Sequence, residues 1–415
     1  MLLWVVGIYS IYTLLKIYLS IMQIGYVNQE KLKDAVILPS GKYLVAGNYA
    51  VAKEKLSIIE TFVDYLLFLW FVFFGLSWLQ SITGIDGISS SLLFLLGFFT
   101  INFIVSLPFS IYSKFKIDQE FGFNKMTPKM FIIDTIKSSL LFLIFGGAIF
   151  SLLVWIIDSF SSWWFWGFVV LFGVALLINI IYPTIIAPMF NKFTPLEDGD
   201  LKESIKKMMS EVGLSSDGIF VMDASKRDTR LNAYFGGLGK SKRVVLFDTL
   251  LEKLTNQELL AVLGHELGHY SHKDIWKNIG MMGGFLFVAF YIFGHLPESL
   301  FTEIGIVPTG GAVLAIIILL LPVLSFIYTP IMSIISRHNE YEADKFGSKM
   351  GGKNNLVSAL LKLVKENKSF PKSDPIYSKF YYSHPPIIER LKALGFDVDK
   401  PLPKDGIFQF MDESK

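Results

Sequence analysis

Seven separate stretches of the chain are each long and apolar enough to cross a membrane. A helix needs roughly 20 mostly apolar residues to span the hydrocarbon core of a bilayer. The stretches lie at about 2–23, 58–80, 91–112, 138–157, 163–188, 275–296 and 311–335. The first is too long and too apolar for the central region of a signal peptide, so we expect it to be retained. The sequence therefore predicts an integral multi-pass membrane protein, mainly α, in contact with the lipid bilayer.

Lysines between these stretches are distributed unevenly, and their distribution predicts orientation. Five follow the first stretch and five follow the third, whereas the loops after the second, fourth and sixth have no Lys or Arg. Basic loops stay on the cytoplasmic side. The chain then divides into 1–190 with five spans, 191–274, 275–335 with two further spans, and 336–415. Both polar segments, 191–274 and 336–415, are expected in the cytoplasm.

Composition excludes several other kinds of function. The net charge is only +2, so no nucleic-acid partner is indicated. With 0 cysteines, the chain has neither disulfides nor thiolate metal ligands. Within the apolar stretches, Asn102 and Asn179 are expected to form hydrogen bonds between helices. Glu60 and Asp64 are expected to face water, because a carboxylate in lipid is costly.

The segment from Thr255 to Lys273 carries the strongest chemical signal. Thr255 followed by Glu258 is a capping box, which predicts a helix starting there. On this helix, His265 and His269 lie one turn apart, the spacing at which two imidazoles hold one zinc ion. Glu266 can then accept a proton from the attacking water. The alternative interpretation is two solvated histidines on an exposed helix.

A catalytic zinc takes three protein ligands and keeps one position open. The best third ligand is Glu340, because Asp344 lies one turn further along and can orient a ligand histidine. Glu342 is the rival, but Phe346 stands in its orienting place and a phenyl ring accepts no hydrogen bond. His272 is another rival, more typical of a solvated or orienting group.

A short sheet is predicted ahead of this helix. The run 218–223, with its continuation to Phe235, and the run Arg243 to Phe247 are β-like, and the glycines Gly236, Gly237 and Gly239 form a turn between them.

Seven motifs in order resemble the type I CAAX prenyl protease family over nearly the whole chain. They are EFGFNKMTPKMF, IIAPMFNKFTPLEDGDLKESI, VMDASKR, NAYFGGLGKSKRVVLFDTLL, LGHELGHYSHKD, SRHNEYEADKFG and YYSHPPIIERLKAL. The resemblance implies one zinc ion per chain on His265, His269 and Glu340, with Glu266 as base and Asp344 as orienting acid. It also implies seven helices around a water-filled chamber, capped by a zincin-like α+β domain. Chain length and the EFGFNKMT spelling suggest a prokaryotic member.

The resemblance assigns further roles that spacing alone does not. It implies that His384 helps to stabilise the oxyanion, with Arg390 as a supporting cation. It implies that the edge strand Asn232, Ala233, Tyr234 and Phe235 pairs with an extended substrate. Between VMDASKR and NAYF the chain departs from the family, with Asp228 to Leu231 where a Ser/His-containing stretch is usual.

These features predict a membrane zinc metalloendopeptidase whose substrate is a peptide or protein, with or without an attached lipid. The family resemblance implies cleavage after a prenylated cysteine, in a bacterial inner membrane or, in a eukaryote, the endoplasmic reticulum. The alternatives are a membrane quality-control protease without prenylated substrates and a channel or transporter with a structural zinc.

The lysine pattern makes a direct prediction about topology. Reporter fusions after Lys129 and after Lys415 are expected to read as cytoplasmic, and a fusion near Glu303 is expected to read as external, because basic loops resist translocation. An external signal at Lys415 would contradict the seven-span arrangement.

Overall fold

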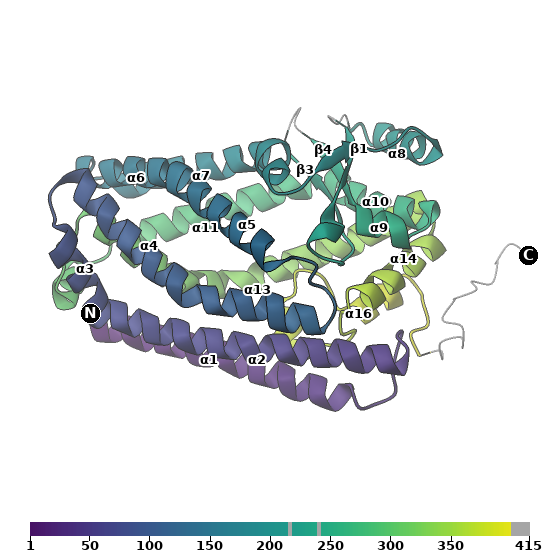
Figure 1. Cartoon of the computed structure of the whole chain (residues 1–415), viewed down its shortest axis with the longest axis horizontal. Coiled ribbons are helices and arrows are strands. Elements are labelled where there is room, and N and C mark those ends of the chain that lie inside the picture. Colours follow the sequence, from purple (N-terminus) through teal and green to yellow (C-terminus); the bar gives the residue numbers. More distant parts are fainter. Residues whose placement is uncertain (215–217, 239–241, 400–415) are drawn as a thin grey trace, which may run out of the picture.

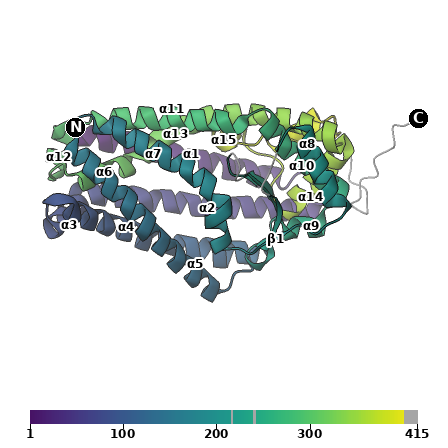
Figure 2. The same cartoon turned by 90° about the horizontal axis from the view of Figure 1, so that it is seen from above.

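The computed structural model describes residues 1–214, 218–238 and 242–399 of the chain. Long helices run side by side along the molecule, and the shorter polar elements gather at one end (Figure 1). Figure 2 shows the same division from a second direction, with those elements at the end opposite the N-terminus. Among the residues that the structure describes, seven helices are long and apolar enough to span a membrane, as the sequence predicted.

Among the described residues there are seven spans, of which the second to the fifth include π-helical or 3₁₀ turns. They are α1 (Leu2–Glu30); α2 (Ser40–Trp70), η1 (Phe71–Gly75) and α3 (Leu76–Thr83); α4 (Gly87–Tyr112) and η2 (Ser113–Asp118); α5 (Pro128–Leu141), η3 (Phe142–Gly146) and α6 (Gly147–Ser159); α7 (Trp163–Ile181), η4 (Tyr182–Ile186) and η5 (Ala187–Met189); α11 (Asp274–Gly294); and α13 (Gly310–Gly351). The short α12 (Glu298–Ile304) lies between the last two spans.

Three spans extend well beyond the apolar stretches that identified them. The second begins at Ser40 rather than 58, the fourth at Pro128 rather than 138, and the seventh continues to Gly351 rather than 335. Hydropathy marks only the part of a helix in lipid, whereas caps and packing set its ends. Glu340 and Asp344 therefore lie on the same continuous helix as the seventh span, and the predicted division at 335 falls inside it.

The expectation for Asn102 and Asn179 was wrong. Each side-chain amide donates to the carbonyl four residues earlier in its own helix, that of Phe98 or Ala175. A hydrogen bond to the carbonyl four residues earlier gives the side-chain amide a partner within its own helix.

Asp64 lines a pocket of about 830 Å³ between α2, α4 and α5, and its access to water stays a prediction. Asn102 and Asp134 line the same pocket. Its extension into one chamber enclosed by all seven helices stays a prediction.

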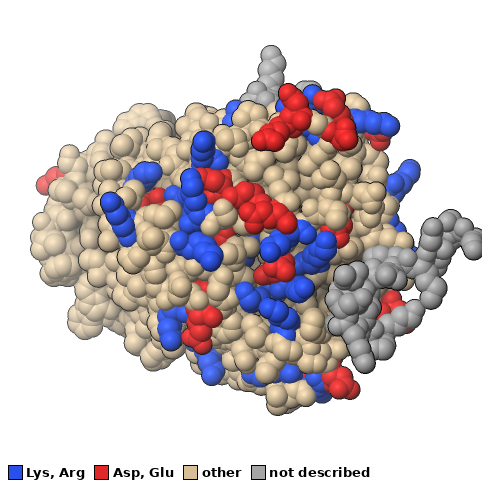
Figure 3. Space-filling view, turned by 45° about the vertical axis from the view of Figure 1, so that its right-hand side comes forward, with Lys and Arg blue, Asp and Glu red and all other residues tan. Residues whose placement is uncertain are grey.

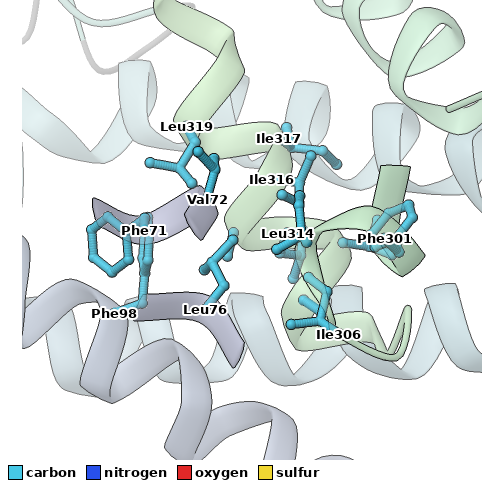
Figure 4. Close-up of a cluster of buried hydrophobic side chains, with 14 of the residues drawn as sticks. Phe71, Val72, Leu76, Phe98, Phe301, Ile306, Leu314, Ile316, Ile317 and Leu319 are labelled. Atoms are coloured by element: carbon cyan, nitrogen blue, oxygen red, sulfur yellow. The ribbon is translucent and has the colours of Figure 1, made fainter. Parts of the chain in front are cut away.

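Apolar packing between spans two, three and seven fixes the bundle away from the polar end. Phe71, Leu76 and Phe98 are almost completely buried against Leu314 and its neighbours on α13 (Figure 4). This core holds the first half of α13 in place. The same helix carries functional side chains in its second half.

The polar end consists of a small sheet and several short helices. The strands are β1 (Phe193–Pro195), β2 (Ile219–Met222), β3 (Ala233–Gly236) and β4 (Arg243–Phe247). The helices are α8 (Asp200–Glu211), η6 (Ala224–Lys226), α9 (Asp248–Lys253), α10 (Asn256–Ser271), α14 (Lys353–Glu366), α15 (Pro375–Tyr381) and α16 (Ile387–Ala393).

The sheet has the order β1-β2-β4-β3, in which only β2 and β4 are parallel. The run predicted from 218 to Phe235 divides into two strands, β2 and β3, because the helical turn η6 lies between them. β3 stands at the edge of the sheet, and the predicted turn residue Gly239 lies outside the described residues.

Lys, Arg, Asp and Glu side chains gather over the polar end, while the surface over the spans shows few of them (Figure 3). This division is the one expected where one part of a molecule faces water and the other faces lipid.

Helices α10 and α13 approach each other so closely that glycine is required. A Cβ at Gly347 of α13 would lie 2.7 Å from the backbone nitrogen of His265, and one at Gly268 would lie 2.9 Å from the Cα of Ala343. Small residues permit such backbone contact between helices. The contact places the two halves of the polar end against each other at His265.

Replacing Gly347 with Ala is therefore expected to push α10 away from α13. Overpacking of this kind costs roughly 1 to 3 kcal/mol, so the melting temperature and the zinc affinity should both fall. Gly280→Ala in α11 is the matched control, because a Cβ there meets no atom within 4 Å. Equal melting temperatures and zinc affinities in the two variants would contradict the close-packing account.

Candidate metal centre and active site

Helix α10 presents both histidines of the HExxH motif on one face. Thr255 and Glu258 form the predicted capping box, which fixes where the helix begins. Ten residues after this cap, His265 is buried, and the His269 ring lies perpendicular to its ring with the centroids 4.9 Å apart. Helix α10 thus supplies two of the residues that the sequence identified as ligands.

Glu340 of α13 lies directly opposite these two rings. Its carboxylate oxygens are 3.5 Å from Nε2 of His265 and 3.2 Å from Nε2 of His269. One donor atom from each of the three residues fits within a span of 4.8 Å. Oε2 of Glu340 is buried and accepts no hydrogen bond within the described ranges 1–214, 218–238 and 242–399. Two imidazole nitrogens and a carboxylate at this spacing fit a zinc ion.

Each of the two histidines is held by an acid on its other ring nitrogen. Asp344 Oδ1 lies 2.8 Å from Nδ1 of His265, and Asp274 Oδ2 lies 2.9 Å from Nδ1 of His269. An acid at Nδ1 fixes the tautomer in which Nε2 is free to bind a metal. Both Nε2 atoms therefore face Glu340.

Asp274 was missed by the sequence analysis. It lies five residues after His269, at the first position of α11, and the break between the helices turns it back toward the ring. Lys273 adopts a left-handed conformation there, with φ 57°. One sequence signal could have identified it. Asp274 is an acid between the HExxH helix and an apolar span, a position where a charge needs a partner.

Charges around the ligands act on the pKa of His269 and of Glu266. Burial opposes the charged form of His269, but hydrogen bonds with Glu340 and Asp274 outweigh it and raise its pKa to about 9. A metal must displace that proton, so metal affinity should increase with pH below this value. Burial also raises the pKa of Glu266, against the opposing effect of the two histidines. A carboxylate with a raised pKa is a stronger proton acceptor.

His384 and Arg390 approach Glu340 from the C-terminal segment. Nε2 of His384 lies 3.3 Å from Oε1 of Glu340, and the His384 side chain is 64% exposed. Arg390 is buried, forms a bidentate pair with Asp344 at 2.8 and 2.6 Å, and lies 3.3 Å from Oε2 of Glu340. The Arg390 guanidinium therefore contacts both Asp344 and Glu340 of α13. The sequence analysis did not anticipate these contacts.

A pocket of about 660 Å³ opens onto this cluster. Glu266, His269, Glu340 and His384 line one part of it, and the end of β3 with the following turn, residues 235–238, lines another. The edge strand and the metal ligands thus share one space. Of the strand residues singled out from the sequence, Phe235 lines this pocket, while Asn232, Ala233 and Tyr234 lie further along the strand.

The rival ligands lie elsewhere. Glu342 forms an exposed ion pair with Lys345 at 2.6 Å. His272 packs against the ring of Phe346, with centroids 6.0 Å apart, and the group of possible metal ligands among the described residues does not include it.

The membrane bundle brings two histidines of an HExxH helix together with a glutamate from another helix. The Glu266 carboxylate and a substrate-sized pocket lie beside them. This combination defines a membrane zinc metallopeptidase. Comparison with known proteins extends this assignment. Residues 195–395 match the model of peptidase family M48, and residues 29–192 match the model described as CAAX prenyl protease N-terminal, five membrane helices.

Curated relatives cover most of the chain. CAAX prenyl protease 1 of Saccharomyces cerevisiae is 38% identical over 85% of this chain and 85% of its own length. The CAAX prenyl protease 1 homolog of Arabidopsis thaliana is 34% identical over 95% and 98%. The crystal structure of S. mikatae Ste24p superposes with a TM-score of 0.85 at 35% identity, over 94% of this chain and 97% of that one. The chain belongs to the CAAX prenyl protease 1 family within the M48 metallopeptidases, which are zinc-dependent.

The assignment of the third ligand predicts distinct metal contents for four variants. Glu340→Ala should lose zinc, whereas Glu342→Ala, its matched control two residues away, should keep it. Asp344→Asn and Asp274→Asn should bind zinc about 10- to 100-fold more weakly, because each removes an acid that orients a ligand. Zinc content and affinity of the purified proteins measure this, and full occupancy in Glu340→Ala would overturn the assignment.

Proposed function

We propose that this metalloendopeptidase, with one zinc per chain, cuts C-terminal CAAX segments after a lipidated cysteine. The observation that carries the proposal is the shared pocket, since residues 235–238 of the edge strand line the same space as Glu266 and Glu340. An extended peptide on that edge would pass beside the ligands. The relatives named CAAX prenyl protease 1 support this substrate class.

Different residues of the chain then have different roles in hydrolysis. Zinc, when bound, lowers the pKa of water toward about 7 and polarises the scissile carbonyl. Glu266 accepts the proton from the attacking water and returns it to the leaving amine. His384 donates a hydrogen bond to the developing oxyanion. Arg390 fixes Asp344, and through it His265, during the reaction.

We also propose that the catalytic end faces the cytoplasm. The lysine-rich loops after the first and third spans support this orientation. In a prokaryotic source the membrane would be the inner membrane, and in a eukaryotic one the endoplasmic reticulum.

A broad membrane quality-control protease is the main competitor, because pairing through the backbone tolerates many sequences. Trapping with Glu266→Gln followed by mass spectrometry separates the two. Captured lipidated C-terminal segments would support the proposal. Captured fragments without lipid or a defined C-terminus would favour the competitor.

The role of Glu266 gives a kinetic prediction. Glu266→Gln should retain zinc, since Glu266 is not a ligand, and should lose on the order of 10²- to 10⁴-fold in kcat, the usual contribution of a general base. Cleavage of a farnesylated peptide by purified enzyme measures this. Glu342→Gln is the matched control and should retain its activity. Wild-type turnover in Glu266→Gln would contradict the mechanism.

A further inference from the structure

Asn367 forms a two-bond contact with the backbone of Leu231, just ahead of the edge strand. The amide of Leu231 donates to Oδ1 of Asn367 at 2.8 Å, and Nδ2 of Asn367 donates to the carbonyl of Leu231 at 3.1 Å. This is the pair of bonds that a neighbouring strand would make. Asn367 lies at the C-terminal end of α14, so a helix side chain occupies a position that another strand could fill.

The pairing register shows which side of the strand Asn367 occupies. Ala233 is opposite Leu246 in the β3–β4 pair, so Asn232 is opposite Phe247, whose amide donates to the Asn232 carbonyl at 3.1 Å. The backbone groups of Asn232 therefore point toward β4. Successive residues alternate, so the backbone groups of Leu231, Ala233 and Phe235 point to the open edge.

On that open edge, the described residues leave a short free segment. The Ala233 amide donates to Oδ1 of Asn232 at 2.9 Å. No hydrogen bond to a described residue engages the Ala233 carbonyl or the amide and carbonyl of Phe235. A strand added from the pocket can thus pair with the amide and carbonyl of Phe235 and with the carbonyl of Ala233, but it meets Asn367 at Leu231.

Two cations flank this blocked position. Lys368 follows Asn367, and Arg230 precedes Leu231. Nζ of Lys368 lies 4.1 Å and the guanidinium of Arg230 lies 4.2 Å from the ring centre of Phe123.

Only one of the two cations forms an ion pair with a described residue. Arg230 is paired with Asp118 at 2.6 Å and with Asp228 at 2.8 Å. Lys368 has no ion pair among residues 1–214, 218–238 and 242–399. Burial, with Lys42 and Arg230 nearby, lowers its pKa, and Glu366 and Asp228 offset this effect only in part. An anion beside Lys368 would be favourable.

From these contacts we infer that Asn367 ends the substrate-binding edge and that Lys368 binds the C-terminal carboxylate of the substrate there. The inference rests on the proposed function. An antiparallel peptide runs opposite to β3, so its C-terminus lies at the Leu231 end, where Lys368 has no ion-pair partner among the described residues. A parallel peptide would run in the other direction. If it began at Leu231, its positive amino terminus would lie beside Lys368, and if it began earlier, the middle of its chain would meet Asn367.

The distance along the strand matches a short tail. Phe235 lines the pocket that His269 and Glu340 also line, and it lies four positions after Leu231. At about 3.3 Å per residue, the distance from Phe235 to Leu231 along the strand is about 13 Å. This length leaves room for about three substrate residues after the cleaved peptide bond. Asn367 and Lys368 would then select tails of the length that follows a CAAX cysteine.

The test uses farnesylated peptides in which the cysteine is followed by three or five residues, with a free or an amidated C-terminus. The full-length enzyme should prefer three residues and a free acid. Asn367→Ala should lower the ratio of kcat/KM for three over five residues by about 3- to 10-fold, the scale of one or two hydrogen bonds. Lys368→Gln should raise KM for the free acid and leave the amide unchanged.

Controls on the same helix are available. Asn354→Ala and Lys365→Gln should leave both ratios at the wild-type values, and zinc content and melting temperature should be equal in all the variants used. If Asn367→Ala does not fold, Asn367→Asp replaces it. This variant keeps the acceptor for Leu231 but places a negative charge beside the carboxylate, and it should weaken cleavage of the acid selectively.

The outcomes separate the inference from the proposed function. Unchanged ratios in an active Asn367→Ala or Asn367→Asp enzyme, or a wild type that treats the peptides alike, overturn the inference alone. A wild type that cleaves no farnesylated peptide overturns the proposed function, and the inference with it.

Discussion

The close approach of α10 to α13 is the contact on which the site depends. Glycine at 347 lets the α13 backbone pass within reach of the backbone of His265, and glycine at 268 does the same at Ala343. Because helices are stiff, this contact fixes the angle at which His265 and His269 face Glu340. The site is therefore not held by one segment. It forms where a polar helix meets the continuation of a membrane span.

Burying so many ionisable groups together requires that each be paired. Five acidic and basic side chains around Glu340 form ion pairs with one another. Asp344 pairs with both His265 and Arg390, and Asp274 pairs with His269. Arg390 also pairs with Glu340. Removing one partner from such a set leaves a buried charge, which is far more costly than the pair is stabilising. Glu266 forms no ion pair or side-chain hydrogen bond with another described residue, and this leaves its carboxylate available for proton transfer.

Much of this arrangement could be predicted from the sequence, because apolar length and helical spacing are local signals. The seven spans, the capping box at Thr255 and the proximity of Glu340 to the HExxH helix follow from such patterns. The extension of α2 to Ser40 and the bonds of Asn102 within its helix did not follow, since packing and capping decide them. Asp274, Arg390 and Asn367 act across turns or long separations in sequence, so no spacing rule identifies their partners.

A diffraction map recorded at the zinc absorption edge tests the central claim most directly. In zinc-loaded crystals of the full chain, the account predicts one anomalous peak at about 2.0 to 2.2 Å from Nε2 of His265, Nε2 of His269 and the Glu340 carboxylate. A fourth position facing the pocket should hold no protein ligand. A peak at any other position, or a fourth protein side chain closing the coordination sphere, would contradict the account.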